Sequence, residues 1–436
     1  MTAFFGTFCH APVRGTVECL SDAVIEVDAS GVIARVLRAG DGGYEMAKVG
    51  AERLGGFVLP GFCDLHVHAP QWPQLGLALD VPLEVWLQTH TFPLEARYSD
   101  LDFARANYSG LVDELLRQGT TTAMYFASIH TEATKLLADI CLAKGQRALI
   151  GKVAMDNPDQ CPPFYCETTD ALLSGTQAVI EHIRGFACDR IRPVVTPRFI
   201  PSCSDAALTG LGEIARSCNC HVQTHCSESD WQHGYVRARY GVNDAESLDR
   251  FGLLTRHTVL AHGNFLNDGD FDLIRARGAG IAHCPLSNHY FSNAVFPLRR
   301  ALEKGVRVGL GTDIAGGPSA SSFESMRWAV ASSRALADGV DASRASGERG
   351  VAGSAVDWKT AFYCATKGGA EALDLPVGAF EPGRRFDAFQ VDPEVPGGTV
   401  HLMGEAPEVA LQKIIYTASK ANIVRVWVDG ALIPSH

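Results

Sequence analysis

The sequence has 436 residues, a length that suits one large domain carrying a small appendage. Apolar residues make up 46% and charged residues 20%, a balance that predicts a packed globular body and excludes a largely disordered chain. The net charge of -11 argues against a nucleic-acid-binding surface, and no apolar run approaches the roughly 20 residues of a membrane-spanning helix.

The cysteines give no sign of a disulfide framework. There are 13 of them, an odd count without regular spacing, although Cys218 and Cys220 form a C-x-C pair. We therefore expect free, mostly buried thiols in a reducing compartment. The first residues lack a basic stretch followed by a long apolar run, so we predict no signal peptide and a cytoplasmic protein.

Strand-like patterns occupy both ends of the chain. They lie at 23–28, 32–37, 386–391 and 423–430, and the first two are joined by a turn signal that predicts a hairpin. Because chain termini often lie close in space, we expect these segments to pack together. The predicted domains are a small β domain made of 1–59 plus 376–436, and a catalytic domain at 60–375.

The middle of the chain alternates strand-like and helix-like segments, a pattern typical of a parallel sheet with crossover helices. The predicted strands are 57–66, 121–126, 148–155, 193–196, 221–224, 258–261, 280–282 and 306–309. Predicted helices include 103–118, 131–144, 170–187 and 204–217, the last with Ser204 as N-cap. Eight strands in this order predict an α/β fold of the (β/α)8 TIM-barrel type, whose active site lies at the carboxyl ends of the strands.

Histidine and aspartate recur at those predicted strand ends. The first strand ends in His66 and His68, whose i, i+2 spacing turns both imidazoles to one side of a strand. Later strands end at His225, His262 and Asp313. Nitrogen and oxygen ligands of this kind suit zinc, with iron(II) as the alternative. His262 could either ligate the metal or hydrogen-bond an attacking water.

Glu228 lies three residues after His225, where a carboxyl group could carry a proton between water and a substrate nitrogen. The alternative is a carboxylate that stabilises a helix N-terminus. The predicted fourth strand carries no lysine that could bridge two metals, and Lys152 on the third is expected to be structural, so we predict one metal per chain. The segment 81–97 is too long for a tight loop and could help to cover the site.

These strand ends resemble the metal-dependent amidohydrolase superfamily, and within it the guanine deaminase family. The resemblance spans nearly the whole chain and is carried by PGFCDLHVHAPQ (60–71), TFP (91–93), GKVAMD (151–156), VTPRF (195–199), QTHCSE (223–228), AHG (261–263), HCPLSN (283–288) and VGLGTDIAGG (308–317). The HxH motif and the final aspartate are common to the superfamily, whereas HAPQ, TPRF, GKVAMD and GTDIAGG are more specific.

The resemblance implies that one zinc ion assists the hydrolysis of guanine to xanthine and ammonia in purine catabolism, in a homodimer. It implies His66, His68, His225 and Asp313 as metal ligands, with Glu228, His262 and Asp313 as catalytic residues. It implies substrate contacts from Gln71, Arg198 and Phe199, and also from His68, His225, Glu228 and Asp313. An amide, a guanidinium fork and an aromatic ring suit the edge and face of a purine.

Three other interpretations stay open at this level. The same residues could deaminate another heterocycle, such as 8-oxoguanine, cytosine or a triazine. A cyclic-amide hydrolase is a second alternative, against which the missing lysine argues. The third is a non-catalytic scaffold that has kept the fold. Trp72 and Pro73, directly after Gln71, could alter the rim of the pocket and with it the substrate preference.

Overall fold

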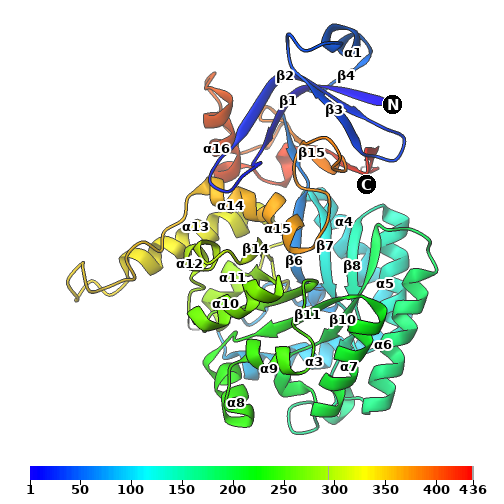
Figure 1. Cartoon of the computed structure of the whole chain (residues 1–436), viewed down its shortest axis with the longest axis vertical. Coiled ribbons are helices and arrows are strands. Elements are labelled where there is room, and N and C mark those ends of the chain that lie inside the picture. The colour runs from blue at the N-terminus through cyan, green and yellow to red at the C-terminus, as the bar shows by residue number, and fades with distance from the viewer. Residues whose placement is uncertain (293, 435–436) are drawn as a thin grey trace.

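The computed structural model describes residues 1–292 and 294–434, which form a barrel and a separate small sheet (Figure 1). Within these residues, eight parallel strands run in the order β6-β7-β8-β10-β11-β12-β13-β14. Their bounds are Phe62–His68, Thr120–Phe126, Arg147–Gly151, Ile191–Pro197, His221–Cys226, Thr258–His262, Gly280–His283 and Arg307–Leu310. The predicted (β/α)8 barrel is thereby confirmed.

The barrel closes where the chain after β14 returns to β6. The amide of Asp313 donates to the carbonyl of His66 over 2.9 Å, and the amide of His68 donates to the carbonyl of Ile314 over 2.9 Å. The carboxylate of Asp64 adds a side-chain link, since it accepts from both the amide and the hydroxyl of Thr312. The first and last strands of the barrel are therefore held together at the end where both carry predicted site residues.

The prediction of one strand over 57–66 is wrong at Gly61. The chain forms β5 (Phe57–Pro60) in the small sheet and then β6 in the barrel. A Cβ on Gly61 would lie 2.0 Å from the hydroxyl oxygen of Thr121, so only glycine fits at this crossing. The strand predicted over 148–155 is also divided, into β8 and β9 (Val153–Ala154), with Lys152 between them.

The small sheet joins segments from both ends of the chain, as predicted. Its strands follow the order β17-β16-β15-β5-β1-β2-β3, with β4 beside β1. Their bounds are β1 Thr2–His10, β2 Glu18–Val27, β3 Ile33–Leu37, β4 Glu52–Arg53, β15 Ala388–Val391, β16 Ile423–Val428 and β17 Ala431–Leu432. Phe4 of β1 stacks on Phe386 and meets the edge of Trp427, which ties the two chain ends into one apolar core.

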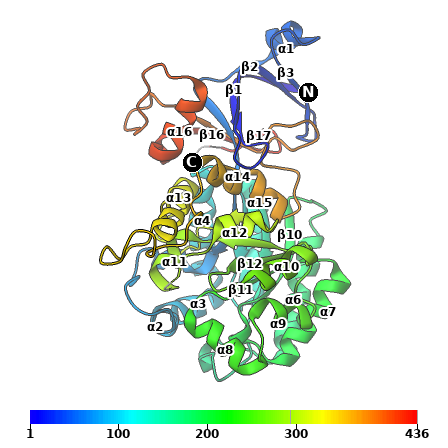
Figure 2. The ribbon, with the colours of Figure 1, turned by 60° about the vertical axis from the view of Figure 1, so that its left-hand side comes forward.

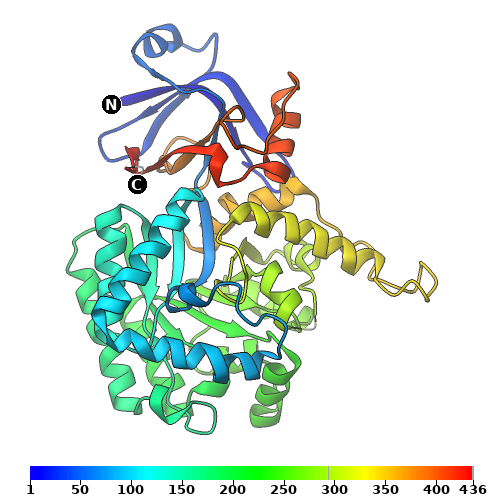
Figure 3. The same cartoon turned by 180° about the vertical axis from the view of Figure 1, so that it is seen from behind.

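Helices surround the barrel strands, most clearly when the molecule is viewed from behind (Figure 3). They are α4 Leu101–Arg117, α5 Thr131–Lys144, α6 Thr169–Arg184, α7 Asp205–Cys218, α8 Asp230–Tyr240, α9 Asp244–Arg250, α10 Asp268–Arg277, α11 Pro285–Phe291, α12 Leu298–Glu303, α13 Ser322–Asp338, α14 Trp358–Ala365 and α15 Lys367–Ala372. Ser204 caps α7 through the amide of Ala207, as its position predicted. Helices α1 Tyr44–Gly50 and α16 Pro407–Thr417 lie beside the small sheet.

The segment between β6 and α4 forms short helices. They are the 3-10 turn Ala69–Gln74, α2 Leu83–Trp86, the π-helical turn Leu87–Thr91, α3 Phe92–Ala96 and the 3-10 turn Arg97–Ser99. Both α2 and α3 lie at the end of the barrel away from the small sheet, with α8 nearby (Figure 2). No helix among the described residues is long and apolar enough to cross a membrane.

Candidate active site

Four imidazoles and a carboxylate converge at the carboxyl end of the barrel. His66 and His68 come from β6, His225 from β11 and His262 from β12, and Asp313 follows β14. The Nε2 atoms of His68 and His225 lie 3.0 Å apart, and Nε2 of His66 lies 3.1 Å from Oδ1 of Asp313. These residues and Glu228 form three overlapping groups that could each hold a metal ion, and within each group the ligand atoms lie within 4.8 Å of one another. The groups are His66, His225 and His262; His66, His68 and Asp313; and Glu228, His262 and Asp313. The structure thus brings the five predicted strand-end residues together.

The histidines present the form that binds a metal. Burial lowers the pKa of His66, His68 and His225, so their rings are neutral and keep a nitrogen lone pair. Nδ1 of His225 donates to the carbonyl of Arg198 over 2.6 Å, which turns its Nε2 toward the cluster. Nε2 of His66 and of His262 is buried without a hydrogen-bond partner. Unpaired buried nitrogens facing a carboxylate fit a divalent metal ion.

Asp313 stays ionised in this setting. Burial alone would raise the pKa of its carboxyl group, but the imidazoles of His66 and His262 hold that pKa below its ordinary range. Its backbone has a φ of 51°, an uncommon conformation for a non-glycine residue. Asp64, which the sequence reading missed, supports it by fixing the neighbouring Thr312, and burial raises the pKa of Asp64 to about 7.

Glu228 faces the cluster from just beyond β11. Its Oε1 lies 3.6 Å from Nε2 of His262, and burial raises the pKa of Glu228 to about 7. A carboxyl group with a pKa near neutrality can both accept and return a proton. Glu228 precedes Ser229, the N-cap of α8, so the alternative role as a helix-stabilising carboxylate does not account for its burial beside His262.

A network that the sequence did not reveal holds the turn before Glu228. Ser227 has a left-handed backbone with φ 47°, a strained conformation for serine. The buried carboxylate of Asp244 accepts from the amide and hydroxyl of Ser227 and from the side-chain amide of Gln232. Gln232 also donates to the carbonyl of His225, so one network supports both the end of β11 and the turn that leads to Glu228.

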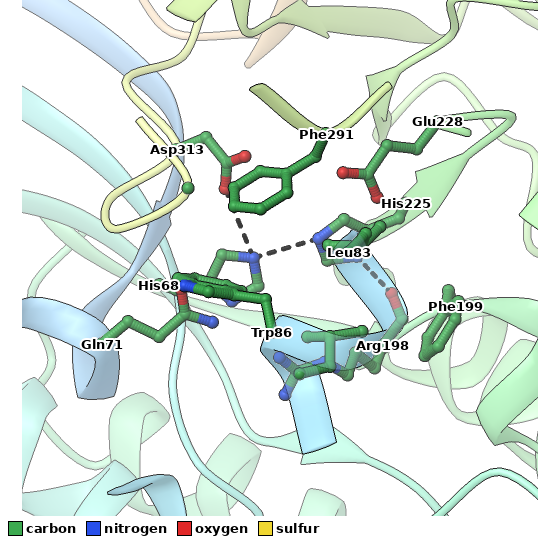
Figure 4. A pocket seen from close by; sticks show the side chains of 12 residues that line it. His68, Gln71, Leu83, Trp86, Arg198, Phe199, His225, Glu228, Phe291 and Asp313 are labelled. Atoms are coloured by element: carbon green, nitrogen blue, oxygen red, sulfur yellow. Dashed lines mark hydrogen bonds and ion pairs between the residues drawn. The ribbon is translucent and has the colours of Figure 1, made fainter. Parts of the chain in front are cut away.

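Gln71, Arg198 and Phe199 line the same pocket. They lie on one side of His68 and His225, with Glu228 and Asp313 on the other (Figure 4). Four apolar side chains that the sequence did not single out complete the pocket, namely Leu83, Trp86, Leu87 and Phe291. The first three belong to the segment 81–97. That segment therefore covers the site, as predicted.

Glu95 is a further missed residue. Its buried carboxylate accepts from both terminal nitrogens of Arg198, over 2.7 and 3.1 Å. Burial would lower the pKa of Arg198, but the charge of Glu95 raises it above its ordinary value. The only sequence signal was a carboxylate inside the covering segment, directly after the TFPL stretch.

Two residues near the site, Lys152 and Cys226, have structural roles, as expected for Lys152. Lys152 is buried and pairs with Glu167 over 2.5 Å, away from the histidine cluster. Cys226 is buried in the apolar core beside the barrel rather than in the pocket.

Known proteins resemble this chain over nearly its full length. The model of the Amidohydrolase family matches residues 57–433. The guanine deaminase of Homo sapiens is 36% identical, over 98% of this chain and 95% of its own, and that of Escherichia coli is 30% identical, over 87% and 83%. The crystal structure of guanine deaminase from C. acetobutylicum with bound guanine in the active site has 30% identity and a TM-score of 0.89, covering 99% of each chain.

Proposed function

This chain belongs to the amidohydrolase family, among its guanine deaminases, and we propose that it hydrolyses guanine to xanthine and ammonia. One observation carries this proposal. A single pocket joins the residues suited to a metal and to proton transfer with three side chains suited to a purine. A pocket with a few convergent polar groups and shifted pKa values is the expected form of an enzyme active site.

The proposed roles begin with substrate orientation. Arg198 offers N–H donors to the carbonyl oxygen and a ring nitrogen of guanine, because a guanidinium has no acceptor. Gln71 offers its amide to the edge of the ring. Phe199, which is buried beside Trp231 and lines the pocket, packs against the flat face. Together these contacts direct the amino-bearing carbon C2 toward the histidine cluster.

His66, His68, His225 and Asp313 would hold the metal, which when bound lowers the pKa of water and so makes a nucleophile available at neutral pH. Asp313 and His262 hold the attacking water by hydrogen bonds. As the water oxygen bonds to C2, Glu228 takes the water proton and delivers it to the adjacent ring nitrogen. The remaining water proton, now on the C2 hydroxyl group, is transferred to the amino group; the C2–N bond breaks, the C2 carbonyl forms, and ammonia leaves. The product is xanthine.

We propose one zinc ion per chain. Three imidazoles and one carboxylate match the ligands that zinc prefers, and iron(II) is the alternative. The absence of lysine from β10 (IRPVVTP), together with the pairing of Lys152 with Glu167, supports one metal rather than a lysine-bridged pair. Metal analysis of the purified protein measures both identity and stoichiometry.

The deciding experiment is an assay of purified, metal-loaded protein with guanine, following xanthine by absorbance and ammonia by a coupled enzyme. We expect equimolar products and loss of turnover after chelation. Parallel assays with 8-oxoguanine, cytosine and a triazine test the alternative heterocycles. A protein that binds metal but releases no ammonia from any of them would instead be the non-catalytic scaffold.

We further propose a homodimer that works in the cytoplasm. Cys63, Cys141 and Cys203, for example, are buried free thiols, and free thiols of this kind support a reducing compartment. Light scattering coupled to size-exclusion chromatography tests the dimer, and fractionation of the source cells tests the location.

A further inference from the structure

Glu95 connects the two polar residues that are proposed to orient the purine. Its Oε1 accepts from Nε2 of Gln71 over 2.9 Å and from Arg198 over 3.1 Å, while its Oε2 accepts from Arg198 over 2.7 Å. The carboxylate is fully buried, as are both partners. Glu95 itself does not line the pocket, so it acts on a ligand through its two neighbours.

The contact fixes which way the Gln71 amide points. Its Nε2 faces Glu95, and its Oε1 accepts from the amide of Ala315 over 3.1 Å. A flipped amide would set an oxygen against a carboxylate and an NH2 group against an N–H donor, so the observed orientation is the one that satisfies both partners. Gln71 therefore keeps its remaining N–H as the donor free for a ligand.

The contact also decides the charge that a ligand meets. Arg198 is always protonated, and a guanidinium without a counterion in a buried pocket would attract any anion strongly. The two-pronged pair with Glu95 cancels that charge but leaves further N–H groups of Arg198 available. The pocket thus offers hydrogen-bond donors without an uncompensated positive charge.

We propose that Glu95 is a positioning residue that holds Arg198 and Gln71 in one donor orientation and neutralises the guanidinium, so that the pocket favours a neutral oxo-purine over its anion. This inference rests on the proposed function, because xanthine loses a proton more readily than guanine does. A charge-balanced Arg198 binds the neutral substrate and does not retain the anionic product.

The test is calorimetric binding of xanthine and hypoxanthine to the metal-loaded protein, at a mildly alkaline pH where xanthine is largely anionic and hypoxanthine largely neutral. In Glu95→Gln we expect the affinity for xanthine relative to hypoxanthine to rise at least about tenfold, because the charge of Arg198 is no longer cancelled. The KM for guanine should rise more than kcat falls, because Arg198 and Gln71 lose their fixed orientation. If both ligands weaken together and the ratio stays as in the wild type, the proposal is wrong.

Two further variants separate charge from folding. Glu95→Asp keeps the charge but shortens the side chain, so the ligand ratio should stay within about threefold of the wild type while the KM for guanine rises. A tenfold change in the ratio in Glu95→Asp would overturn the proposal, and this variant decides the matter if Glu95→Gln does not fold. Glu167→Gln breaks a different ion pair, with the buried Lys152, and should leave the ratio unchanged.

The guanine assay on the wild-type protein separates failure of the proposed role of Glu95 from failure of the proposed deaminase activity. A wild-type enzyme that deaminates guanine, combined with an unchanged ligand ratio in Glu95→Gln, refutes the role of Glu95 alone. A wild-type protein that neither deaminates guanine nor binds either purine refutes the proposed function and, with it, the inference.

Discussion

Oε1 of Glu228 and Nε2 of His262 face each other over 3.6 Å, although Glu228 follows β11, His262 ends β12, and the two residues lie 34 positions apart in the sequence. Nε2 of His262 also lies 3.8 Å from Oδ2 of Asp313. On its other side, Nδ1 of His262 lies 2.9 Å from the side-chain oxygen of Asn288. With its proton on Nδ1, His262 offers a lone pair between the two carboxylates, the arrangement needed to hold a water whose proton is to be removed.

Replacing Glu228 tests the proton-transfer role. Glu228→Gln preserves the shape of the side chain and removes its ability to exchange a proton, so we expect kcat to fall by about 10²- to 10⁴-fold. Metal content should stay at the wild-type level, because the proposed ligands are untouched. Steady-state kinetics with guanine and elemental analysis measure the two quantities, and Glu246→Gln on the exposed face of α9 is the control. Near-normal turnover would exclude Glu228 as the proton carrier.

The metal site can be tested by comparing a histidine in the cluster with a histidine at the opposite end of the barrel. His68→Ala removes one proposed ligand and should lower metal content and activity by at least about tenfold. His257→Ala is the matched control, since His257 directly precedes β12 at the opposite end from His262 and lies 3.6 Å from Asp374 rather than near the cluster. Full metal occupancy in His68→Ala, measured by elemental analysis, would rule out His68 as a ligand.

The barrel and the five strand-end residues could be predicted because they follow from local rules. Periodic apolar segments give the strands, and a parallel barrel places all carboxyl ends of its strands at one face. His66 and His225 could therefore be assigned to one site without any knowledge of the contacts between them. The break at Gly61 could not be predicted, because the crossing against Thr121 that requires glycine exists only in the folded chain.

The residues that support the site were missed for the same reason. Glu95 and Asp244 belong to short helices after β6 and after β11, and neither lies at a strand end. Glu95 matters because it binds Arg198, which is distant in the sequence. Asp244 matters because it binds Ser227, which lies in a strained turn. A buried carboxylate in a helical segment has no periodic signature, so only its observed burial and hydrogen bonds identify it.

The link between the barrel and the small sheet yields a stability prediction. Arg147 of β8 donates from Nε and Nη2 to the buried carboxylate of Asp387, over 2.9 and 3.2 Å, and from Nη2 to Asp429 over 2.5 Å. Arg147→Met leaves Asp387 buried without its counterion, so we expect the free energy of unfolding to fall by about 3–5 kcal/mol. Denaturant titration measures the loss. Arg425→Met, which breaks an exposed pair with Glu52, should cost less than about 1 kcal/mol. Equal effects of the two variants would contradict the prediction.

A pH prediction follows from His221, at the start of β11. Burial lowers the pKa of His221 to about 4, and its Nε2 lies 2.8 Å from the carbonyl oxygen of Leu373, to which it donates when the ring is neutral. In the unfolded chain the pKa returns to about 6.5, so between these values the unfolded state binds more protons. The contribution of His221 to stability is therefore complete above about pH 6.5 and is lost as the pH falls toward 4. In His221→Gln, which can still donate to Leu373, the decrease in unfolding free energy from about pH 7 to about pH 5 should be roughly 2 kcal/mol smaller than in the wild type. Denaturant titrations of both proteins at the two pH values measure the difference, and parallel pH dependences would show that His221 does not titrate on unfolding.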